Sequence, residues 1–258
     1  MHHIQRFTLA ALTAVLTLAS ATAGAEEKQE KQKAAHWDYR GAQGMAHWAK
    51  LDRDFEVCGT GHRQSPIDIR QATPAPLPAL EFGYGAVAPA IVNNGHTIQV
   101  TVPAGQFLTV GGKRYQLLQF HFHTPSEERI KGKASAMVAH LVHRDEEGHL
   151  GVVAVLLEPG SRGSAFDTVL ENLPRKAGQT LTVADLNLDL QSLLPKDRRY
   201  YDFEGSLTTP PCSEGVHWMV LREPVKVQPK SIQAFRSLYA QNARSVQPLW
   251  GREVKASQ

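Results

Sequence analysis

The segment QFHFHTPSEE, residues 119–128, places two histidines two positions apart. His121 and His123 alternate with Phe120 and Phe122, and a period of two is typical of a β-strand. Successive side chains of a strand point to opposite faces, so the two histidines share one face and the two phenylalanines share the other. The alternation therefore predicts a strand that is anchored by its phenylalanines and presents imidazoles on its second face.

A third histidine, His140, lies in a second alternating segment, MVAHLVH, in which His143 would face the opposite side. His140 is 17 positions after His123, and a turn at Gly132 would let the second strand return to the same sheet. Three neutral imidazoles on one sheet face form the ligand set of a catalytic Zn²⁺ site, which keeps one position open. A buried, hydrogen-bonded histidine is the alternative for each residue taken singly, but both imidazoles of the His121 and His123 pair would then need partners.

An iron site is a second interpretation of the same segment. His121, His123 and the downstream Glu127 provide two histidines and one carboxylate, the ligand set of non-haem iron oxygenases. A cupin-like barrel would carry this iron site, but the glycine pattern expected before the histidine pair is absent and the segment SLTTPP would have no role. Metal analysis would discriminate, since iron and oxygen-dependent turnover would favour the iron site.

The elements that must position these side chains are mostly strands. Helical patterns are short and cover residues 165–172 and 231–239, and no internal repeat is present. The pattern predicts a mainly β domain, α+β only by its small peripheral helices. The segments with strand character are 91–92, 97–102, 107–110, 114–122, 136–143 and 150–157.

The N-terminal residues predict an exported protein. Residues 1–25 carry Arg6 as their one charged residue, then an apolar run and the small-residue stretch ATAGA, which is the pattern of a cleaved signal peptide. The apolar run is shorter than the roughly 20 residues of a membrane span, so we expect no span after cleavage. Residues 26–35 are predicted to form a charged, flexible leader, and residues 36–258 the folded domain. We expect the mature protein to be periplasmic or secreted.

Charge and cysteine content narrow the partners and the compartment. The chain has 28 Lys and Arg against 25 Asp and Glu residues and no long basic run, which predicts no nucleic-acid partner. Its two cysteines, Cys58 and Cys212, favour a disulfide in an oxidising compartment, with two unpaired thiols as the alternative.

Several motifs together resemble the α-class carbonic anhydrases, in their bacterial exported form. The resemblance implies an α-carbonic anhydrase fold, a single domain on a large, mostly antiparallel, twisted central β-sheet, and the possibility of a homodimer. It also implies reversible hydration of CO₂ to bicarbonate and a proton, by attack of a hydroxide bound to Zn²⁺. The motifs are QFHFHTPSE, MVAHLVH, GSLTTPPCSEGVHW, HWDY at 36–39, RQSPIDI at 63–69, VNNGH at 92–96 and QPL at 247–249.

The resemblance assigns roles to individual residues. The zinc ligands would be His121, His123 and His140. Thr208 would orient the hydroxide and donate its own hydroxyl proton to Glu127. His96 would shuttle the proton, because an imidazole with a pKa of about 6.5 can accept and release protons near neutrality.

Further positions match the family's substrate wall and its ordered water. Plain core packing is the alternative for the apolar ones, and Gln99 stands where the family commonly has Asn. The wall positions are Val142, Val152, Leu207, Thr209, Val216 and Trp218. The water-network and supporting positions are Tyr39, Asn94, Gln99 and Gln119, of which Gln119 would support His121.

One position departs from the family. A glutamate often stands two residues before the third ligand and supports its imidazole, but this chain has Val138 there. We expect a backbone carbonyl, a water or another side chain to support His140, and a Val138→Glu variant to bind zinc at least as well. Some proteins keep this fold as non-enzymatic binding proteins after losing ligands, whereas this chain retains all three histidines, Thr208 and Glu127.

Overall fold

The computed structural model describes residues 35–161, 163–182 and 187–258. The predicted signal peptide, 1–25, and the charged leader up to residue 34 lie outside the described residues. Within these ranges, no helix is long and apolar enough to cross a membrane.

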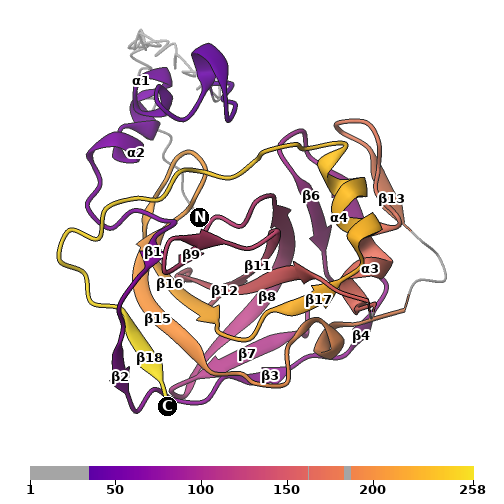
Figure 1. Ribbon diagram of the computed structural model, residues 1–258. Coiled ribbons are helices and arrows are strands. Elements are labelled where there is room, and N and C mark those ends of the chain that lie inside the picture. Colours follow the sequence, from indigo (N-terminus) through magenta and orange to yellow (C-terminus); the bar gives the residue numbers. More distant parts are fainter. Residues whose placement is uncertain (1–34, 162, 183–186) are drawn as a thin grey trace, which may run out of the picture. The chain divides into compact units, whose positions relative to one another are not determined.

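A large twisted sheet dominates the described part of the chain, where it contains 13 strands (Figure 1). Most neighbouring strands are antiparallel, and the pairs β12–β16, β12–β17 and β18–β2 are parallel. The main path runs in the order β13 (Thr180–Thr182), β5 (Ala90–Asn93), β6 (Ile98–Thr101), β8 (Lys113–His123), β11 (Met137–Arg144), β12 (Leu150–Pro159), β16 (Glu214–Leu221), β15 (Tyr200–Ser206), β18 (Lys255–Ser257) and β2 (Thr73–Ala75). The strands off this path are β3 (Glu81–Gly83), β7 (Phe107–Val110) and β17 (Val225–Val227).

The remaining elements are short. Two small sheets combine β1 (Asp68–Ile69), β9 (Arg129–Ile130) and β10 (Lys133–Ala134), and β4 (Ala86–Val87) with β14 (Leu188–Asp189). The helices are α1 (Trp48–Leu51), α2 (Val57–Thr60), α3 (Ala165–Leu170) and α4 (Pro229–Arg236), with 3-10 turns at Gly41–Gln43, Arg53–Phe55 and Leu190–Leu193. The predicted mainly β fold with small helices is therefore confirmed.

The helix boundaries differ from the predicted ones for local reasons. α4 begins at Pro229 rather than 231, because proline suits the first helical position, where its missing N–H costs no hydrogen bond. α3 begins at Ala165 as predicted, after Ser164, which forms a capping box with Asp167. Both helices end earlier than the periodicity predicted, at Leu170 and Arg236.

Strand register gives the sheet two distinct faces. His121 pairs with His140 across β8 and β11, and Phe120 pairs with Leu141. Paired residues point to the same face, so the histidines lie together and the phenylalanines lie on the opposite side. The core row continues through Val100, Phe120, Leu141, Val153 and Met219, all of them buried in one apolar cluster.

Two helices close the phenylalanine face. α3 and α4 lie side by side (Figure 1), and each contributes an aromatic ring. Phe166 of α3 contacts Phe120 and Phe122, and Phe235 of α4 contacts Phe122, with ring centroids 5.9–6.2 Å apart. This packing fixes β8, so the histidines of its other face are held by the same strand that the core immobilises.

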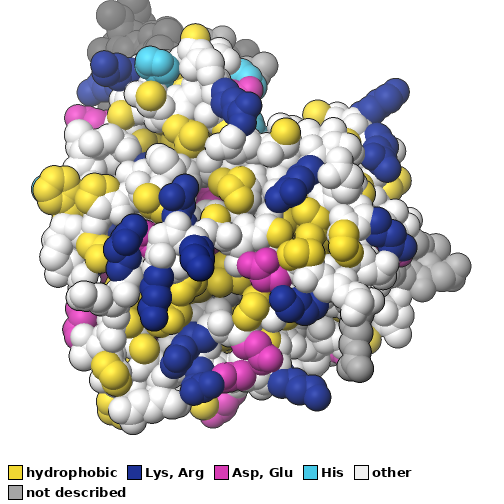
Figure 2. All heavy atoms as spheres, viewed as in Figure 1, with side chains coloured by type: hydrophobic (Ala, Val, Ile, Leu, Met, Phe, Trp, Pro, Cys, Tyr) yellow, Lys and Arg dark blue, Asp and Glu magenta, His cyan; other side chains and the backbone are white. Residues whose placement is uncertain are grey.

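The surface drawn in Figure 2 mixes side chains of different kinds. Lys and Arg side chains are spread over this face, with Asp and Glu in a few smaller groups and hydrophobic side chains between them. Charges that are interspersed in this way suit a soluble surface.

Candidate metal centre

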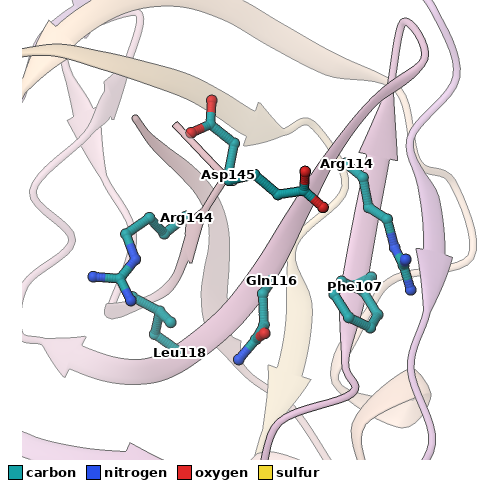
Figure 3. Close-up of a pocket in the computed structure, with 7 residues that line it drawn as sticks. Phe107, Arg114, Gln116, Leu118, Arg144 and Asp145 are labelled. Atoms are coloured by element: carbon teal, nitrogen blue, oxygen red, sulfur yellow. The ribbon is translucent and has the colours of Figure 1, made fainter. Parts of the chain in front are cut away.

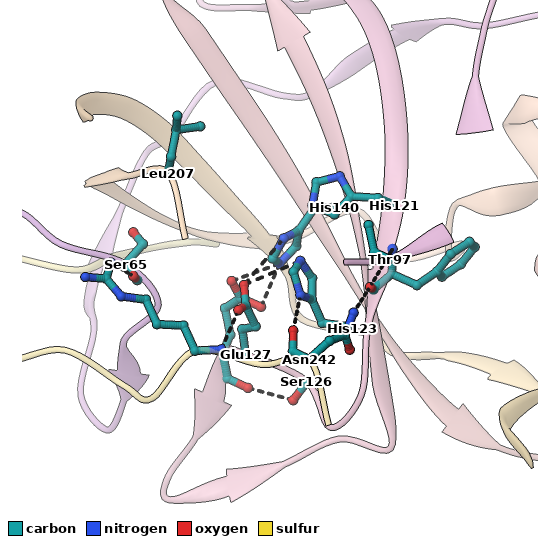
Figure 4. Close-up of polar contacts among 12 residues, drawn as sticks. Ser65, Thr97, His121, His123, Ser126, Glu127, His140, Leu207 and Asn242 are labelled. Carbon is teal, nitrogen blue, oxygen red and sulfur yellow. Dashed lines mark hydrogen bonds and ion pairs between the residues drawn. The ribbon is translucent and has the colours of Figure 1, made fainter. Parts of the chain in front are cut away.

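His121 and His123 each direct ring nitrogen Nδ1 to a partner behind the ring, and Figure 4 shows this contact for His123 and Asn242. His121 Nδ1 lies 2.9 Å from Gln119 Oε1, and His123 Nδ1 lies 2.7 Å from the backbone oxygen of Asn242. Both partners are acceptors, so each Nδ1 carries the proton and donates it. The lone pair of each imidazole is therefore on Nε2, the nitrogen that faces the centre.

His140 is turned the other way. Its Nε2 lies 3.1 Å from both carboxylate oxygens of Glu128, which leaves Nδ1 as the free nitrogen. One nitrogen from each of His121, His123 and His140 lies within 4.8 Å of the other two. The three lone pairs thus converge on one point.

The convergent nitrogens fit a metal ion. His123 Nε2 is buried and has no hydrogen-bond partner among the described residues. A buried nitrogen of this kind is unfavourable without a partner, and a metal ion supplies one. Three histidine nitrogens are a donor set that suits Zn²⁺.

Burial keeps two of the imidazoles neutral, as metal ligands must be. Burial, and then the nearby His140, lower the pKa of His121 to about 3 and that of His123 well below its usual value. Burial also acts to lower the pKa of His140, but the Glu128 and Glu127 carboxylates outweigh it and the pKa is raised.

The support of His140 comes from a residue that the sequence did not single out. Val138 is fully buried in an apolar cluster and pairs with His123, so it offers no polar group. Glu128, also fully buried, supplies the carboxylate from the loop that follows β8. The adjacent pair of glutamates at the end of QFHFHTPSEE was the available signal.

Glu127 occupies the centre of the polar site. Its Oε1 accepts a hydrogen bond from the backbone N–H of Arg244, at 2.7 Å, while Oε2 lies 3.5 Å from His123 Nε2 and has no protein hydrogen-bond partner in the described part of the chain. Burial raises the pKa of Glu127 to about 7, and Glu128 raises it further, whereas His140, the Arg244 amide and the Thr208 hydroxyl oppose the shift. Thr208 is therefore near enough to influence the Glu127 carboxylate, and Arg244 is an additional residue of the site.

The loop 207–213 that carries Thr208 is anchored at both ends. Leu207 N–H donates to Ser213 O at 3.0 Å, and Cys212 N–H donates to Thr209 O at 2.9 Å. A disulfide joins Cys212 to Cys58 in α2, so the loop is also tied covalently to the N-terminal part of the domain. Thr208 is buried and Thr209 is half-buried in this loop.

The apolar wall positions lie beside the histidines. Val142, Val152 and Trp218 form one row across β11, β12 and β16, on the histidine face. The Trp218 ring meets the His140 ring at a centroid distance of 4.9 Å. Val216 and the half-buried Leu207 belong to the same apolar cluster, which is separate from the main core.

His96 stacks on an aromatic ring outside the sheet. Its ring lies 3.8 Å from that of Trp37, with the planes 9° apart. Asn94 Oδ1 accepts from the backbone N–H of His96 and holds the turn, and Asn242 Nδ2 donates to His96 O. Asn242 therefore connects the turn of His96 to His123, a link between distant segments that had no local sequence signal.

The other predicted water-network residues have mixed surroundings. Tyr39 is buried, and burial followed by the Glu127 charge raises its pKa, which places the phenol in the electrostatic range of the site. Gln99 pairs with His121 across β6 and β8, but its amide donates to Thr101 at 3.4 Å. Gln119 is the amide that contacts an imidazole.

A pocket of 280 Å³ lies further along the same sheet face (Figure 3). Arg144 and Gln116 pair across β11 and β8 there, four residues beyond His140 on its strand. The metal-facing histidines do not line this pocket. Its walls are Phe107, Arg114, Gln116, Leu118, Arg144, Asp145 and Glu146.

A second group of potential ligands is more exposed. It contains Asp145, Glu147 and His149. Lys113 Nζ lies 2.6 Å from Asp145, so a protein cation already compensates the carboxylate. The three-histidine group is the better metal site.

Comparison with known proteins adds independent findings. Residues 43–258 match the family described as eukaryotic-type carbonic anhydrase. A carbonic anhydrase of Neisseria gonorrhoeae is 42% identical over 251 residues, which cover 96% of this chain and 97% of the relative. A carbonic anhydrase of Pectobacterium carotovorum is 42% identical over 220 residues, which cover 85% of this chain and 90% of the relative. A solved α-carbonic anhydrase of Thermovibrio ammonificans, in complex with the inhibitor sulfanilamide, superimposes with a TM-score of 0.84 at 40% identity, covering 88% of this chain and 100% of that chain.

Proposed function

We propose, because this chain belongs to the eukaryotic-type carbonic anhydrase family, that it hydrates CO₂ at a Zn²⁺ ion held by His121, His123 and His140. Membership makes the protein a carbonic anhydrase with the fold of that family. The metal, the roles of the residues and the route of the proton are the proposal.

The observation that carries the metal assignment is the set of free ring nitrogens. Each imidazole has one nitrogen engaged by Gln119, Asn242 or Glu128, and the other nitrogens converge within 4.8 Å. Zn²⁺ in such a site lowers the pKa of water to about 7 and makes it a nucleophile at neutral pH. The three partners behind the histidines fix which nitrogen of each ring faces the metal.

Thr208 and Glu127 would orient the nucleophile. Arg244 occupies Glu127 Oε1, so Oε2 is the oxygen available to accept the proton of the Thr208 hydroxyl. With its proton directed to Glu127, Thr208 has only lone pairs to offer on its other side and must act there as an acceptor. Thr208 would therefore restrict the direction from which the nucleophile approaches CO₂, and such orientation of reactants raises the rate.

The wall of Val142, Val152 and Trp218 would receive CO₂. The substrate is small and apolar, and these side chains cover the face beside His140 without adding a polar group. Leu207 and Val216 extend the same wall, and Thr209 lies on the Thr208 loop.

His96 would carry the proton away. Burial and the nearby His36 lower the pKa of His96, and Asp38 raises it. The stack on Trp37 gives the imidazole a defined resting place outside the metal site. Tyr39, Asn94 and Gln99 are the residues we assign to the water path between the two.

An iron site of His121, His123 and Glu127 has less support. Glu127 is not part of the group whose ligand atoms converge, whereas His140 is. The matched relatives are carbonic anhydrases rather than oxygenases.

Export to the periplasm, or secretion, is the localisation that we infer. The disulfide between Cys58 and Cys212 supports an oxidising compartment. Cleavage after residue 25 and assembly as a homodimer stay predictions.

The decisive experiment is a CO₂ hydration assay on zinc-loaded protein by stopped flow. We expect activity that a sulfonamide inhibits, as the sulfanilamide complex of the Thermovibrio relative suggests. His123→Ala should abolish the activity, while the matched control His62→Ala, an exposed histidine, should keep it. Zinc-replete parent protein without activity would overturn the proposal.

A further inference from the structure

The carboxylate that supports His140 comes from an unusual direction. The family resemblance implies a glutamate two residues before the third ligand, on the ligand's own strand, and this chain has Val138 there. The carboxylate of Glu128 instead approaches from the loop after β8 and lies 3.1 Å from His140 Nε2 through both oxygens. The contact is therefore present although the residue that usually makes it is absent.

The loop that carries Glu128 is held rigidly. Ser126 Oγ donates to Glu128 O at 2.7 Å and accepts from Ser135 N–H at 2.8 Å. Thr124 N–H donates to Asn242 Oδ1 at 2.9 Å, which ties the start of the loop to the residue behind His123. The carboxylate is thus placed by several fixed contacts rather than by a free side chain.

Stability of the fold does not explain this glutamate. Its side chain is fully buried, and in the described ranges His140 Nε2 is the one hydrogen-bond donor that its two oxygens have. A buried carboxylate with a single donor is costly to the fold. A dipositive ion on the other side of the imidazole would compensate that charge, which makes the arrangement favourable in the metal-bound protein.

We propose that Glu128 is the positioning residue of the third ligand: it accepts the Nε2 proton of His140, fixes the tautomer and keeps Nδ1 turned toward the metal. The inference rests on the proposed zinc site. Because Glu127 and Glu128 are neighbours, one dipeptide then orients both the third imidazole and Thr208.

The proposal changes the expectation for position 138. Val138 is on the same face as His140, two residues away on the strand, so a glutamate there would reach the space that the Glu128 carboxylate fills. Val138→Glu by itself would bury two carboxylates side by side and weaken both folding and zinc binding. The same substitution should restore zinc binding when Glu128 has been replaced by an uncharged residue.

The test compares Glu128→Gln, Val138→Glu, the exchange variant Glu128→Val/Val138→Glu, and the exposed control Glu81→Gln. The zinc dissociation constant is measured by competition with a chelator, and the thermal midpoint is measured with and without zinc. Glu128→Gln should bind zinc about 10- to 100-fold more weakly, and the exchange variant should recover most of that loss. Without zinc, Glu128→Gln should melt at the parent's temperature or above it.

Two results would overturn the proposal. One is a Glu128→Gln protein that binds zinc as tightly as the parent. The other is a Glu128→Gln protein whose zinc-free form loses stability in proportion to the lost affinity, since that would make Glu128 an ordinary part of the fold. Both results come from Glu128→Gln alone, so they can be obtained even if the exchange variant does not fold. A parent that binds zinc tightly but does not hydrate CO₂ would overturn the proposed function and leave the Glu128 result standing.

Discussion

His140 and His143 lie three residues apart on β11 and are both fully buried, yet they are satisfied in different ways. His143 faces the core, where Nδ1 lies 3.2 Å from Gly151 O and Nε2 contacts the Tyr84 hydroxyl. His140 faces the other side of the sheet, where, among the residues that the structure describes, only Nε2 has a hydrogen-bond partner, Glu128.

The difference separates a structural histidine from a metal ligand. A buried imidazole with partners at both nitrogens needs nothing more, whereas one with a single partner leaves a lone pair for a ligand. Burial and residue type are the same in the two cases, so neither distinguishes them. What distinguishes the two histidines is whether the second ring nitrogen faces a protein partner. Variants of the metal centre and of the core can test this contrast.

The largest effect should come from exchanging the two histidines for alanine in turn. His140→Ala should weaken zinc binding by more than about 100-fold, because loss of a supporting partner alone costs a site about 10- to 100-fold. His143→Ala should lower the free energy of unfolding and leave the zinc dissociation constant of the folded protein close to the parent's. Chelator competition measures the zinc dissociation constants of both variants, and denaturant unfolding measures their free energies of unfolding. Equal losses of zinc affinity would remove the contrast between the two residues.

Removing the disulfide should have the next largest effect. The bridge spans 154 residues and ties the Thr208 loop to α2. In the chain-entropy model such a loop contributes about 4–5 kcal/mol. Denaturant unfolding of the Cys58→Ala/Cys212→Ala variant, compared with oxidised parent, should show a loss of this order, and a loss under about 1 kcal/mol would contradict the model.

The core histidine should make the zinc-free protein sensitive to acid. Burial lowers the pKa of His143 to about 4, against the opposing effect of its backbone hydrogen bonds, while the unfolded chain keeps a value near 6.5. The unfolded state therefore binds the extra proton first, and stability falls as pH drops from about 6.5 to 4, by roughly 3 kcal/mol. Urea unfolding at pH 7 and pH 4 measures the loss.

The matched control for acid sensitivity is the Tyr84→Phe/His143→Leu variant. It removes the titrating group together with the hydroxyl that would otherwise lose its partner. It should lose clearly less stability between the two pH values than the parent. An unchanged pH dependence would mean that other groups cause the acid sensitivity.

The smallest effect should appear at the supporting amides. Gln119 contacts His121 Nδ1, whereas the Gln99 amide is turned to Thr101. Gln119→Ala should weaken zinc binding about 10-fold, at the lower end of the range for such partners, and Gln99→Ala should leave it unchanged. Equal affinities of the two variants would show that the contact with His121 does not support the metal.

Much of the sheet could be predicted from local patterns. Alternation in 114–122 and 136–143 gave the strands β8 and β11 to within one or two residues, and strand parity alone separated His140 from His143. Helix ends were less accurate: the start of α3 after Ser164 matched the prediction, but α4 begins two residues early, at Pro229, and both helices end earlier than apolar periodicity predicted.

The partners of the site could not be predicted in the same way. The Asn242 oxygen that holds His123 is 119 residues away in sequence, and the Arg244 amide on Glu127 is 117 residues away. Neither segment carries a pattern that marks it, since a backbone group serves in both contacts. Only the resemblance to a known family pointed to Thr208 and Glu127 as a pair.

By itself, the sequence determined the two faces of β8 and β11 and the placement of three histidines on one of them, because side-chain alternation is a local property of the extended backbone. Tertiary structure decided which nitrogen of each ring is free and which group stands behind it, because those contacts join loops that the fold alone brings together. The replacement of a usual glutamate by Val138 could be read from the chain. The carboxylate of Glu128 that fills its role became visible only when the loop after β8 was folded back against His140.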